Sequence, residues 1–249
     1  EEMYSVNSPG FAGGDRTSIE LPQVQRDILK ALKKAGKKVV FVNCSGSAVA
    51  LVPEMESCDA ILQAWYPGQA GGLAVADVLF GDFNPSGKLP VTFYKNTDQL
   101  PDFEDYSMKN RTYRYMTEVP LFPFGYGLSY TTFDISKGRL NKKTISAGQD
   151  LNFKVNVKNT GKYDGAEVTQ VYVRKVDDAE GPIKSLRAFR RVPLKAGETC
   201  VVSIDLLPTT FEFFDPTTNT MRIMPGKYEI MYGNSSDIPS GNKLSVTLR

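Results

Sequence analysis

The sequence contains no histidine among its 249 residues. A histidine general base, a catalytic triad with histidine and a histidine-ligated zinc site are therefore excluded for this chain. Any acid–base chemistry must come from carboxylates, lysine or tyrosine. Only three cysteines are present (Cys44, Cys58 and Cys200), and no CxxC or similar metal-binding spacing occurs. The sequence thus predicts no metal and no cofactor.

Concentrated positive charge and long apolar runs are also lacking. The net charge is +2, and the lysines and arginines are scattered along the chain. This pattern argues against nucleic acid or an anionic membrane as a partner, because both require a concentrated basic face. No apolar run approaches the roughly 20 residues that span a bilayer. With 41% hydrophobic and 23% charged residues, the chain is typical of a globular protein with a real core.

The first part of the chain alternates helical and strand-like patterns. Continuous apolar, β-branched runs indicate parallel strands that are buried on both faces. Apolar residues at helical spacing indicate helices between these strands, with Pro22 in the first turn of one and Gly36 after its end. The expected elements are a helix over residues 21–35, strands over 39–42, 60–62 and 89–93, and a second helix between 71 and 81. This alternation predicts an α/β domain over residues 1–94.

The second part reads as an all-β sandwich. Residues 95–133 are rich in proline, glycine, tyrosine and aspartate, and predict a long connection. From residue 134 the apolar period becomes two, and turn sequences such as Lys195-Ala196-Gly197-Glu198 separate the strands. Strands are expected over 151–157, 170–173, 200–206, 228–232 and 244–248. Several short strands over residues 134–249 favour an antiparallel sandwich.

Two further expectations concern single residues. Cys44 and Cys58 flank the buried strands and are expected to be buried thiols, with a disulfide between them left open. Phe211, Phe213 and Phe214 fit either the sandwich core or an exposed aromatic row that binds polysaccharide.

Three stretches stand out as motifs. Gly14-Asp15-Arg16 leads into residues 19–22 (IELP). The second group comprises residues 65–72 (WYPGQAGG), 76–81 (ADVLFG) and 84–90 (NPSGKLP). The third is residues 122–130 (FPFGYGLSY). Taken together and in this order, the stretches resemble the C-terminal half of glycoside hydrolase family 3.

The resemblance covers essentially the whole chain and implies a fold and a chemistry. It implies a (β/α)8 barrel outside this chain, an α/β sandwich domain truncated at its start, and a fibronectin type III-like domain. The chemistry needs two carboxylates roughly 5 Å apart. The family's nucleophilic aspartate lies in the barrel, and its acid/base glutamate precedes the Gly-Asp-Arg element. Glu1 is the first candidate for the acid/base and Glu2 the second.

Further candidate substrate-binding residues are Asp15, Arg16, Trp65, Arg111 and Tyr113. Asp15 and Arg16 can contact sugar hydroxyls or fix their own loop. Trp65 follows a predicted parallel strand, and ligands usually bind at the carboxyl ends of such strands. Arg111 and Tyr113 are residue types common at interfaces, so they are expected to pack against the barrel or to line a leaving-group subsite.

The resemblance implies a retaining exo-β-glycosidase that acts on terminal β-linked sugars of oligosaccharides. Residues 13–22 and 111–115 resemble β-xylosidases more than β-glucosidases. The alternative from another class is a non-catalytic carbohydrate-binding or scaffold module. The implied partners are a glycoside substrate and the barrel, with a homodimer left open, and the implied location is periplasmic or secreted.

Overall fold

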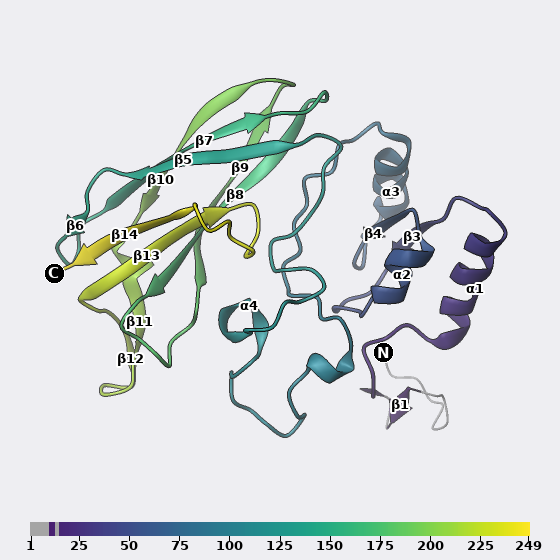
Figure 1. The fold of residues 1–249 in the computed structure, drawn as a ribbon, viewed down its shortest axis with the longest axis horizontal. Coiled ribbons are helices and arrows are strands. Elements are labelled where there is room, and N and C mark those ends of the chain that lie inside the picture. Colours follow the sequence, from purple (N-terminus) through teal and green to yellow (C-terminus); the bar gives the residue numbers. More distant parts are fainter. Residues whose placement is uncertain (1–9, 13–14) are drawn as a thin grey trace. The chain divides into compact units, whose positions relative to one another are not determined.

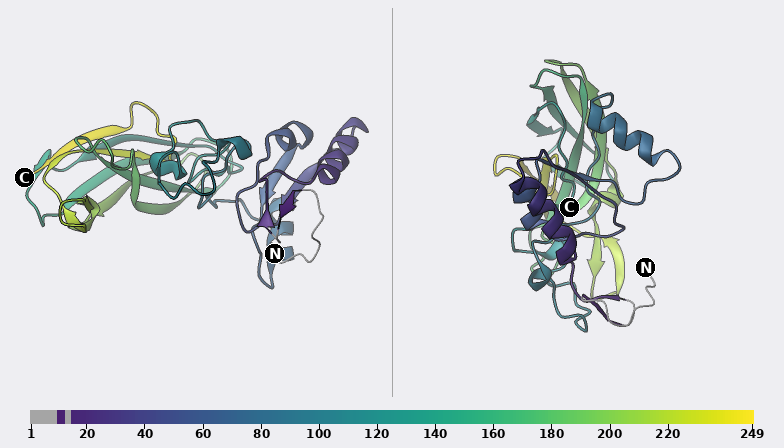
Figure 2. Two further views of the ribbon diagram at one scale, coloured as in Figure 1. Left: turned by 90° about the horizontal axis from the view of Figure 1, so that it is seen from below. Right: turned by 90° about the vertical axis from the view of Figure 1, so that its right-hand side faces the viewer.

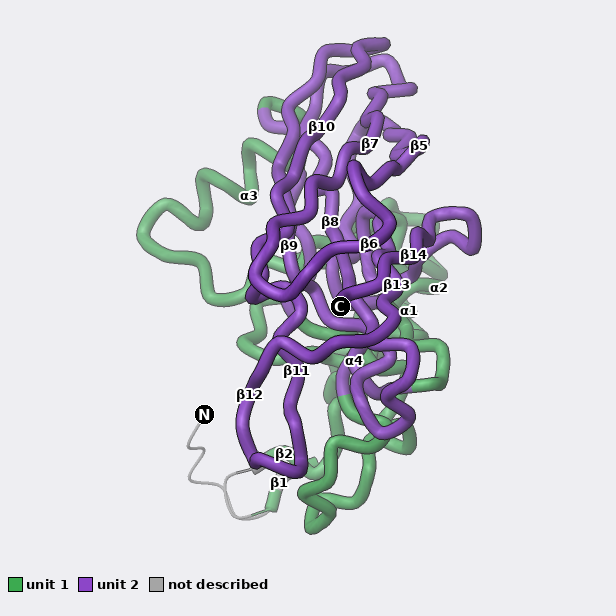
Figure 3. The backbone as a smooth tube through the Cα atoms, turned by 90° about the vertical axis from the view of Figure 1, so that its left-hand side faces the viewer, with its two compact units in different colours: residues 1–82, 91–111, 117–122 green, residues 83–90, 112–116, 123–249 purple. Residues whose placement is uncertain are grey.

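The computed structural model describes residues 10–12 and 15–249, which form two compact units (Figure 1). Unit 1 comprises residues 1–82, 91–111 and 117–122, and unit 2 comprises residues 83–90, 112–116 and 123–249 (Figure 3). The chain therefore passes between the units five times. The linear boundaries at residues 94 and 133 remain predictions.

Unit 1 is built around two parallel strands, β3 (Val40–Asn43) and β4 (Ala60–Gln63), paired with Val40 opposite Ala60. Its helices are α1 (Gln23–Lys34), α2 (Val52–Ser57) and α3 (Gly71–Phe80), with a short 3-10 turn η1 (Thr97–Gln99). A small antiparallel hairpin, β1 (Phe11–Ala12) with β2 (Asp15–Arg16), precedes them. The predicted alternation of helices and parallel strands is confirmed up to residue 81.

The carboxyl end of α1 is the one that the sequence predicts. Lys33 and Lys34 lie in its last turn and Gly36 follows with a φ of 69°, while Pro22, expected at the first helical position, lies one residue earlier at the N-cap. Lysines near a helix carboxyl end stabilise it because they offset the partial negative charge there. The apolar stripe of α1 is nevertheless exposed: 66% of Val24 and 55% of Ile28 are accessible.

Two expectations for unit 1 are wrong. Strand β3 is not buried on both faces, because 48% of Val40 is exposed and β4 is its only strand neighbour within the described part of the chain. Residues 89–93 do not form a third strand. Pro90 has no N–H to donate to a ladder. The backbone of Leu89 instead exchanges hydrogen bonds with Gly125 and Tyr126, and Phe93 makes an isolated bridge to Phe122.

Unit 2 is a sandwich of two mostly antiparallel sheets (Figures 1 and 2). One sheet has the order β10-β7-β5, and the other has the order β6-β14-β13-β8-β9. The strands are β5 (Phe133–Leu140), β6 (Thr144–Ile145), β7 (Leu151–Asn159), β8 (Gly165–Lys175), β9 (Ser185–Leu194), β10 (Thr199–Leu206), β13 (Gly226–Gly233) and β14 (Lys243–Leu248). The 3-10 turn η2 (Pro208–Phe211) and the hairpin β11 (Glu212–Asp215) with β12 (Thr220–Ile223) follow β10, and helix α4 (Thr112–Tyr115) also belongs to this unit.

The sandwich core confirms the predicted two-residue period. Every second residue of β7 from Leu151 to Val157 is fully buried, and Gly197 takes a positive φ of 77° in the turn between β9 and β10. Phe211 and Phe213 are core residues, with 1% and 2% exposed, whereas 53% of Phe214 is accessible. These three residues therefore do not make an exposed aromatic row.

Two of the sequence motifs, residues 84–90 and residues 123–130, pack together on the sandwich in unit 2. We call residues 83–90 the strap. Asn84 accepts hydrogen bonds from Ser129 Oγ (2.9 Å) and the Tyr130 N–H (2.8 Å), and donates to the Asp164 carbonyl of the sandwich (2.9 Å). Lys88 forms an ion pair with Glu167 of β8 at 2.7 Å, and both side chains are about nine-tenths buried or more, with 11% and 5% exposed. Asn84 and Lys88 thus anchor the strap.

The three cysteines are free thiols. Cys58 is buried, and burial raises the pKa of its thiol. Cys44 is exposed, so its predicted burial is wrong; it lies just beyond the end of β3, where the chain leaves the sheet. In the part of the chain that the structure describes, no helix is long and apolar enough to cross a membrane.

Candidate functional site

The carboxyl ends of β3 and β4 carry a group of polar side chains in unit 1. Because parallel strands point the same way, their last residues, Asn43 and Gln63, lie side by side. Asn43 Nδ2 donates to Gln63 Oε1 at 2.6 Å and to Ser45 Oγ at 3.0 Å. Gln63 Nε2 in turn donates to the Ser45 carbonyl at 3.2 Å. Only 5% of Asn43 is exposed, so this network fixes the loop after β3.

The β1–β2 hairpin places Arg16 against the same loop. Arg16 Nη2 donates to Ser47 Oγ at 2.9 Å, and Ser45 Oγ donates to the Ser47 carbonyl at 3.0 Å. We call Arg16, Asn43, Ser45, Ser47 and Gln63 the carboxyl-edge cluster. The Gly-Asp-Arg motif and the loop after β3 are thus joined in space, although 31 residues separate Arg16 from Ser47.

The base of the hairpin is held by Thr97. Thr97 Oγ1 donates to Glu20 Oε2 at 2.5 Å, and the Thr97 N–H donates to Glu20 Oε1 at 2.8 Å. Burial acts to raise the pKa of Glu20, but the Thr97 hydrogen bonds outweigh it and the pKa lies below its usual value. Glu20 is therefore a hydrogen-bonded carboxylate that positions the segment leading out of the hairpin.

Trp65 lies two residues beyond the end of β4, with an unusual positive φ of 57°. Its ring is half-buried and contacts the fully buried Phe93 edge to face, with ring centroids 6.1 Å apart. The following Tyr66 ring lies so close to Gly46 that a Cβ there would come within 2.4 Å of it. These contacts hold both aromatic residues at the edge where β3 and β4 end.

Arg111 and Tyr113 contact residues other than those of the carboxyl-edge cluster. Arg111 donates from its guanidinium to the backbone carbonyls of Asp102, Asp105 and Ser107, closing the loop over residues 102–111. Tyr113 belongs to unit 2 and stacks on Phe124 at 4.2 Å. Its hydroxyl oxygen accepts the Leu186 N–H at 3.1 Å. Both side chains are engaged within their own units.

The remaining candidates are only partly placed. Glu1 and Glu2 lie outside the described residues. Asp15 belongs to β2, and its backbone pairs with Ala12. The carboxyl-edge cluster consists of amides, hydroxyls and a guanidinium, which bind hydroxyl groups and anions but do not exchange protons readily near neutral pH. The cluster can therefore hold a polar ligand, but its own side chains supply no general acid.

Sequence reasoning missed Asn43, Ser45, Ser47 and Gln63. A usable signal was present, because each of the two apolar strands is followed directly by amide or hydroxyl residues. Polar residues at that end of parallel strands commonly bind ligands.

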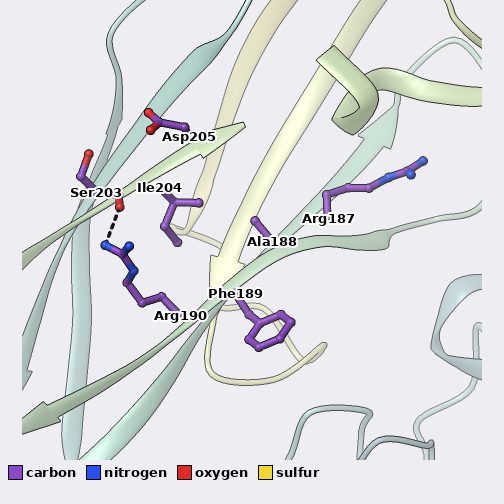
Figure 4. Close-up of a pocket in the computed structure, with 7 residues that line it drawn as sticks. All are labelled: Arg187, Ala188, Phe189, Arg190, Ser203, Ile204 and Asp205. Atoms are coloured by element: carbon purple, nitrogen blue, oxygen red, sulfur yellow. Dashed lines mark hydrogen bonds between the residues drawn. The ribbon is translucent and has the colours of Figure 1, made fainter. Parts of the chain in front are cut away.

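Unit 2 contains a separate shallow pocket of about 420 Å³ between the edges of β9 and β10. It is lined by Arg187, Ala188, Phe189, Arg190, Ser203, Ile204 and Asp205 (Figure 4). Arg190 donates to the Ser203 carbonyl at 3.1 Å and so links the edge strands of the two sheets. Among the described residues, no group of three or more cysteine, aspartate or glutamate side chains is arranged to hold a metal ion.

Comparison with known families identifies both halves of the chain. Residues 2–130 match the glycosyl hydrolase family 3 C-terminal domain, and residues 167–236 match a fibronectin type III-like domain. The chain belongs to glycoside hydrolase family 3. The α/β domain followed by a fibronectin type III-like sandwich, predicted from the motifs, is confirmed.

Individual family 3 relatives match over nearly the whole chain. A xylan 1,4-beta-xylosidase of Xylanibacter ruminicola is 61% identical over 248 residues, which cover 100% of this chain and 28% of the relative. A periplasmic beta-glucosidase of Salmonella typhimurium is 41% identical, covering 92% of this chain and 32% of the relative. The structure of a β-glucosidase, EmGH1, from Erythrobacter marinus matches with a TM-score of 0.83 at 37% identity, covering 98% and 32% of the two chains. This chain thus spans about a third or less of the length of these relatives.

Proposed function

We propose that this chain is the C-terminal part of a retaining exo-β-glycosidase that removes terminal β-linked sugars from oligosaccharides, with β-xylosides as substrates. The observation that carries the proposal is the 61% identity, over the whole chain, to a protein named as a xylan 1,4-beta-xylosidase. Relatives named as beta-glucosidases are 41% and 38% identical. That difference favours the xylosidase over the glucosidase alternative.

In the proposed reaction, an aspartate on a (β/α)8 barrel outside this chain attacks the anomeric carbon and forms a covalent glycosyl-enzyme. Glu1 or Glu2 donates a proton to the leaving glycosidic oxygen, and then takes a proton from the water that releases the sugar. The composition of the carboxyl-edge cluster supports giving proton transfer to residues outside the cluster, because its amides, hydroxyls and guanidinium are suited to binding rather than to proton transfer.

We assign Arg16 and Trp65 to the sugar-binding surface, and Asp15 to the same loop. Arg16 reaches the carboxyl edge of β3 through Ser47, and Trp65 lies just beyond the carboxyl end of β4, where ligands usually bind in such sheets. Arg111 and Tyr113 act as positioning residues, since the contacts of their guanidinium and hydroxyl groups are made to protein backbone. A periplasmic or secreted location is part of the proposal, and the relative named as periplasmic supports it.

The test compares the native polypeptide that carries this chain with the 249-residue chain alone. Aryl β-xyloside and aryl β-glucoside are assayed side by side, with aryl α-xyloside as the control substrate. We expect turnover by the longer polypeptide, faster on the β-xyloside, with β-xylose as the first product detected by NMR. No turnover by a folded long polypeptide, together with saturable sugar binding, would favour the non-catalytic module instead.

Variants of the longer polypeptide test the acid/base assignment. Glu1→Gln and Glu2→Gln are each assayed with two aryl xylosides, one with a poor and one with a good leaving group. The true acid/base variant should lose far more activity on the poor leaving group, which needs protonation, than on the good one. The other variant serves as the matched control. Equal losses on both substrates, or no losses, would remove both residues from the role.

A further inference from the structure

Four buried side-chain atoms of unit 2 have no hydrogen-bond partner among the described residues. Three of them, Nε of Arg114, Nε of Arg187 and Oγ of Ser185, belong to neighbouring segments, and the fourth is Oγ1 of Thr169. Ser185, at the start of β9, is 4% exposed. Buried polar groups in folded proteins nearly always have hydrogen-bond partners, and leaving one unsatisfied is destabilising. Three donors without partners in one region indicate a bound group that completes them.

Backbone contacts place these residues close together. The Ile183 N–H donates to the Arg114 carbonyl at 2.8 Å, and the Leu186 N–H donates to the Tyr113 hydroxyl oxygen at 3.1 Å. Residues 183–186 therefore run alongside α4, with Ser185 between the two contacts. Arg187 lies on the same strand, two residues after Ser185. Burial, and then the positive charge of Arg114, lower the pKa of Arg187, as expected for neighbouring guanidinium groups.

The two guanidinium groups contact carbonyl oxygens and aromatic rings rather than carboxylates. Arg187 donates to the Glu212 carbonyl at 2.6 Å and lies over the Phe213 ring at 4.9 Å, while Arg114 lies over the Tyr115 ring. Neither guanidinium has a carboxylate within 4.0 Å among the described residues. The Glu212 carboxylate is near enough to affect Arg187 but is not paired with it. Both half-buried guanidinium groups are therefore without an ion-pair partner among the described residues.

We propose that Arg114, Arg187 and Ser185 form a binding site for a monovalent carboxylate. A carboxylate supplies one negative charge, and its two oxygens match the planar donor array of arginine. The serine hydroxyl rotates freely and supplies a third hydrogen bond. Such a carboxylate belongs either to a simple organic acid or to a uronic acid sugar. The site is independent of glycosidase activity, so its test requires no turnover.

The experiment follows the Nε–H signals of the arginines by NMR in the ¹⁵N-labelled 249-residue chain. Sodium acetate, sodium glucuronate and sodium chloride are titrated separately at constant ionic strength, with glucose as the neutral sugar control. We expect saturable shifts of two Nε–H signals with a carboxylate but not with chloride. Equal responses to acetate and glucuronate assign the site to simple carboxylates, and a response to glucuronate alone assigns it to uronic acids. Absence of saturation with both, or the same response to chloride, overturns the proposal.

Variants identify the signals and test the geometry. Arg114→Gln and Arg187→Gln should each remove one shifting signal and weaken carboxylate binding roughly tenfold or more, because each removes a charge-assisted hydrogen bond. Ser185→Ala removes only an unpartnered hydroxyl, so it should fold even where an arginine variant does not, and still bind more weakly. Arg190→Gln, on the exposed part of β9, is the matched control and should bind as the wild type does. Wild-type binding by Ser185→Ala and by the folded arginine variants would contradict the assignment.

Discussion

At the scale of single residues, two facing glycines of unit 2 differ in what a side chain would meet. A Cβ on Gly127 would lie 2.1 Å from the Gly87 carbonyl oxygen, whereas a Cβ on Gly87 would meet nothing within 4 Å. The atom opposite Gly127 is backbone and cannot rotate away. The glycine in the FGYG motif therefore allows close approach of the strap.

Gly127→Ala should lower the free energy of unfolding by about 1–3 kcal/mol, because the added methyl group forces two backbone segments apart. Gly87→Ala should change it by less than about 0.5 kcal/mol. Urea unfolding followed by far-UV circular dichroism measures both values. Equal effects of the two substitutions would show that the packing of the segments does not depend on Gly127.

Asp59 should make the stability of unit 1 pH-dependent. Its carboxylate accepts hydrogen bonds from the Val39 N–H at 2.9 Å and from Lys38 and Lys33 at 3.2 Å, and these lower its pKa from 3.8 to about 2. Because the folded-state pKa lies below the unfolded one, the stabilisation is present above pH 4 or so and is lost as the pH falls towards 2. Asp59→Asn should be less stable than the wild type at about pH 5, and the difference should shrink at about pH 2. Urea unfolding of both proteins across this range provides the measurement, and a constant difference would contradict the assignment.

At the scale of elements, the strap is held on β8 by a buried ion pair. Lys88 Nζ lies 2.7 Å from Glu167 Oε1 and donates to the Gly127 carbonyl at 2.8 Å. The other Glu167 oxygen accepts from Asn234 Nδ2 at 3.2 Å. Each charge is thus both paired and hydrogen-bonded, as a buried ion requires.

Removing one partner of this pair should cost far more than removing both. Lys88→Met and Glu167→Met should each lower the free energy of unfolding by about 3–5 kcal/mol, because each leaves a buried charge without a partner. The double variant should lose much less than the sum of the two single losses. Denaturant unfolding of the four proteins completes the cycle, and additive losses would show that the two residues act independently.

The elements were predictable where one period dominated and one face was buried. In β7 the alternation of apolar and polar residues predicted the strand, because the sandwich buries one face of it. Strand β9 was missed, because it carries three arginines and a proline and its middle residues are exposed. Residues 89–93 misled the prediction, because an apolar run resembles a strand even when Pro90 prevents a ladder.

The candidate site was only partly predictable for a different reason. The Gly-Asp-Arg motif indicated Arg16, but its contact with Ser47 depends on how the hairpin and the β3 loop meet in space. No local pattern encodes a contact over 31 residues. Tyr113 was expected at an interface or a subsite, and its actual neighbours, Phe124 and Tyr172, come from distant segments.

At the scale of the whole molecule, the sandwich depends on chain that precedes it. Tyr172 of β8 is fully buried, and burial raises its pKa. Its cover is supplied by Tyr113 and Phe124, with ring centroids 5.8 Å and 6.5 Å away. Gln170 Nε2 also donates to the Gly125 carbonyl at 3.1 Å. Residues 112–116 and 123–126 are therefore part of the folded sandwich unit.

A polypeptide of residues 134–249 should consequently be less stable than the full chain. It keeps all the sandwich strands and lacks only Phe133, the first residue of β5. It loses the aromatic cover of Tyr172 and the Gly125 carbonyl that accepts a hydrogen bond from Gln170. We expect its melting temperature to fall by more than about 5 °C relative to the sandwich transition of the full chain. Circular dichroism and tyrosine fluorescence provide the measurement, and an unchanged melting temperature would show that the cover is dispensable.

The chain passes five times between its units, and this limits how recombination can exchange them. A gene fragment exchanged at a single recombination breakpoint transfers a contiguous stretch of sequence. No single breakpoint separates unit 1 from unit 2, because pieces of each are interleaved between residues 82 and 123. An exchange at one breakpoint therefore cannot transfer one unit whole without also transferring part of the other.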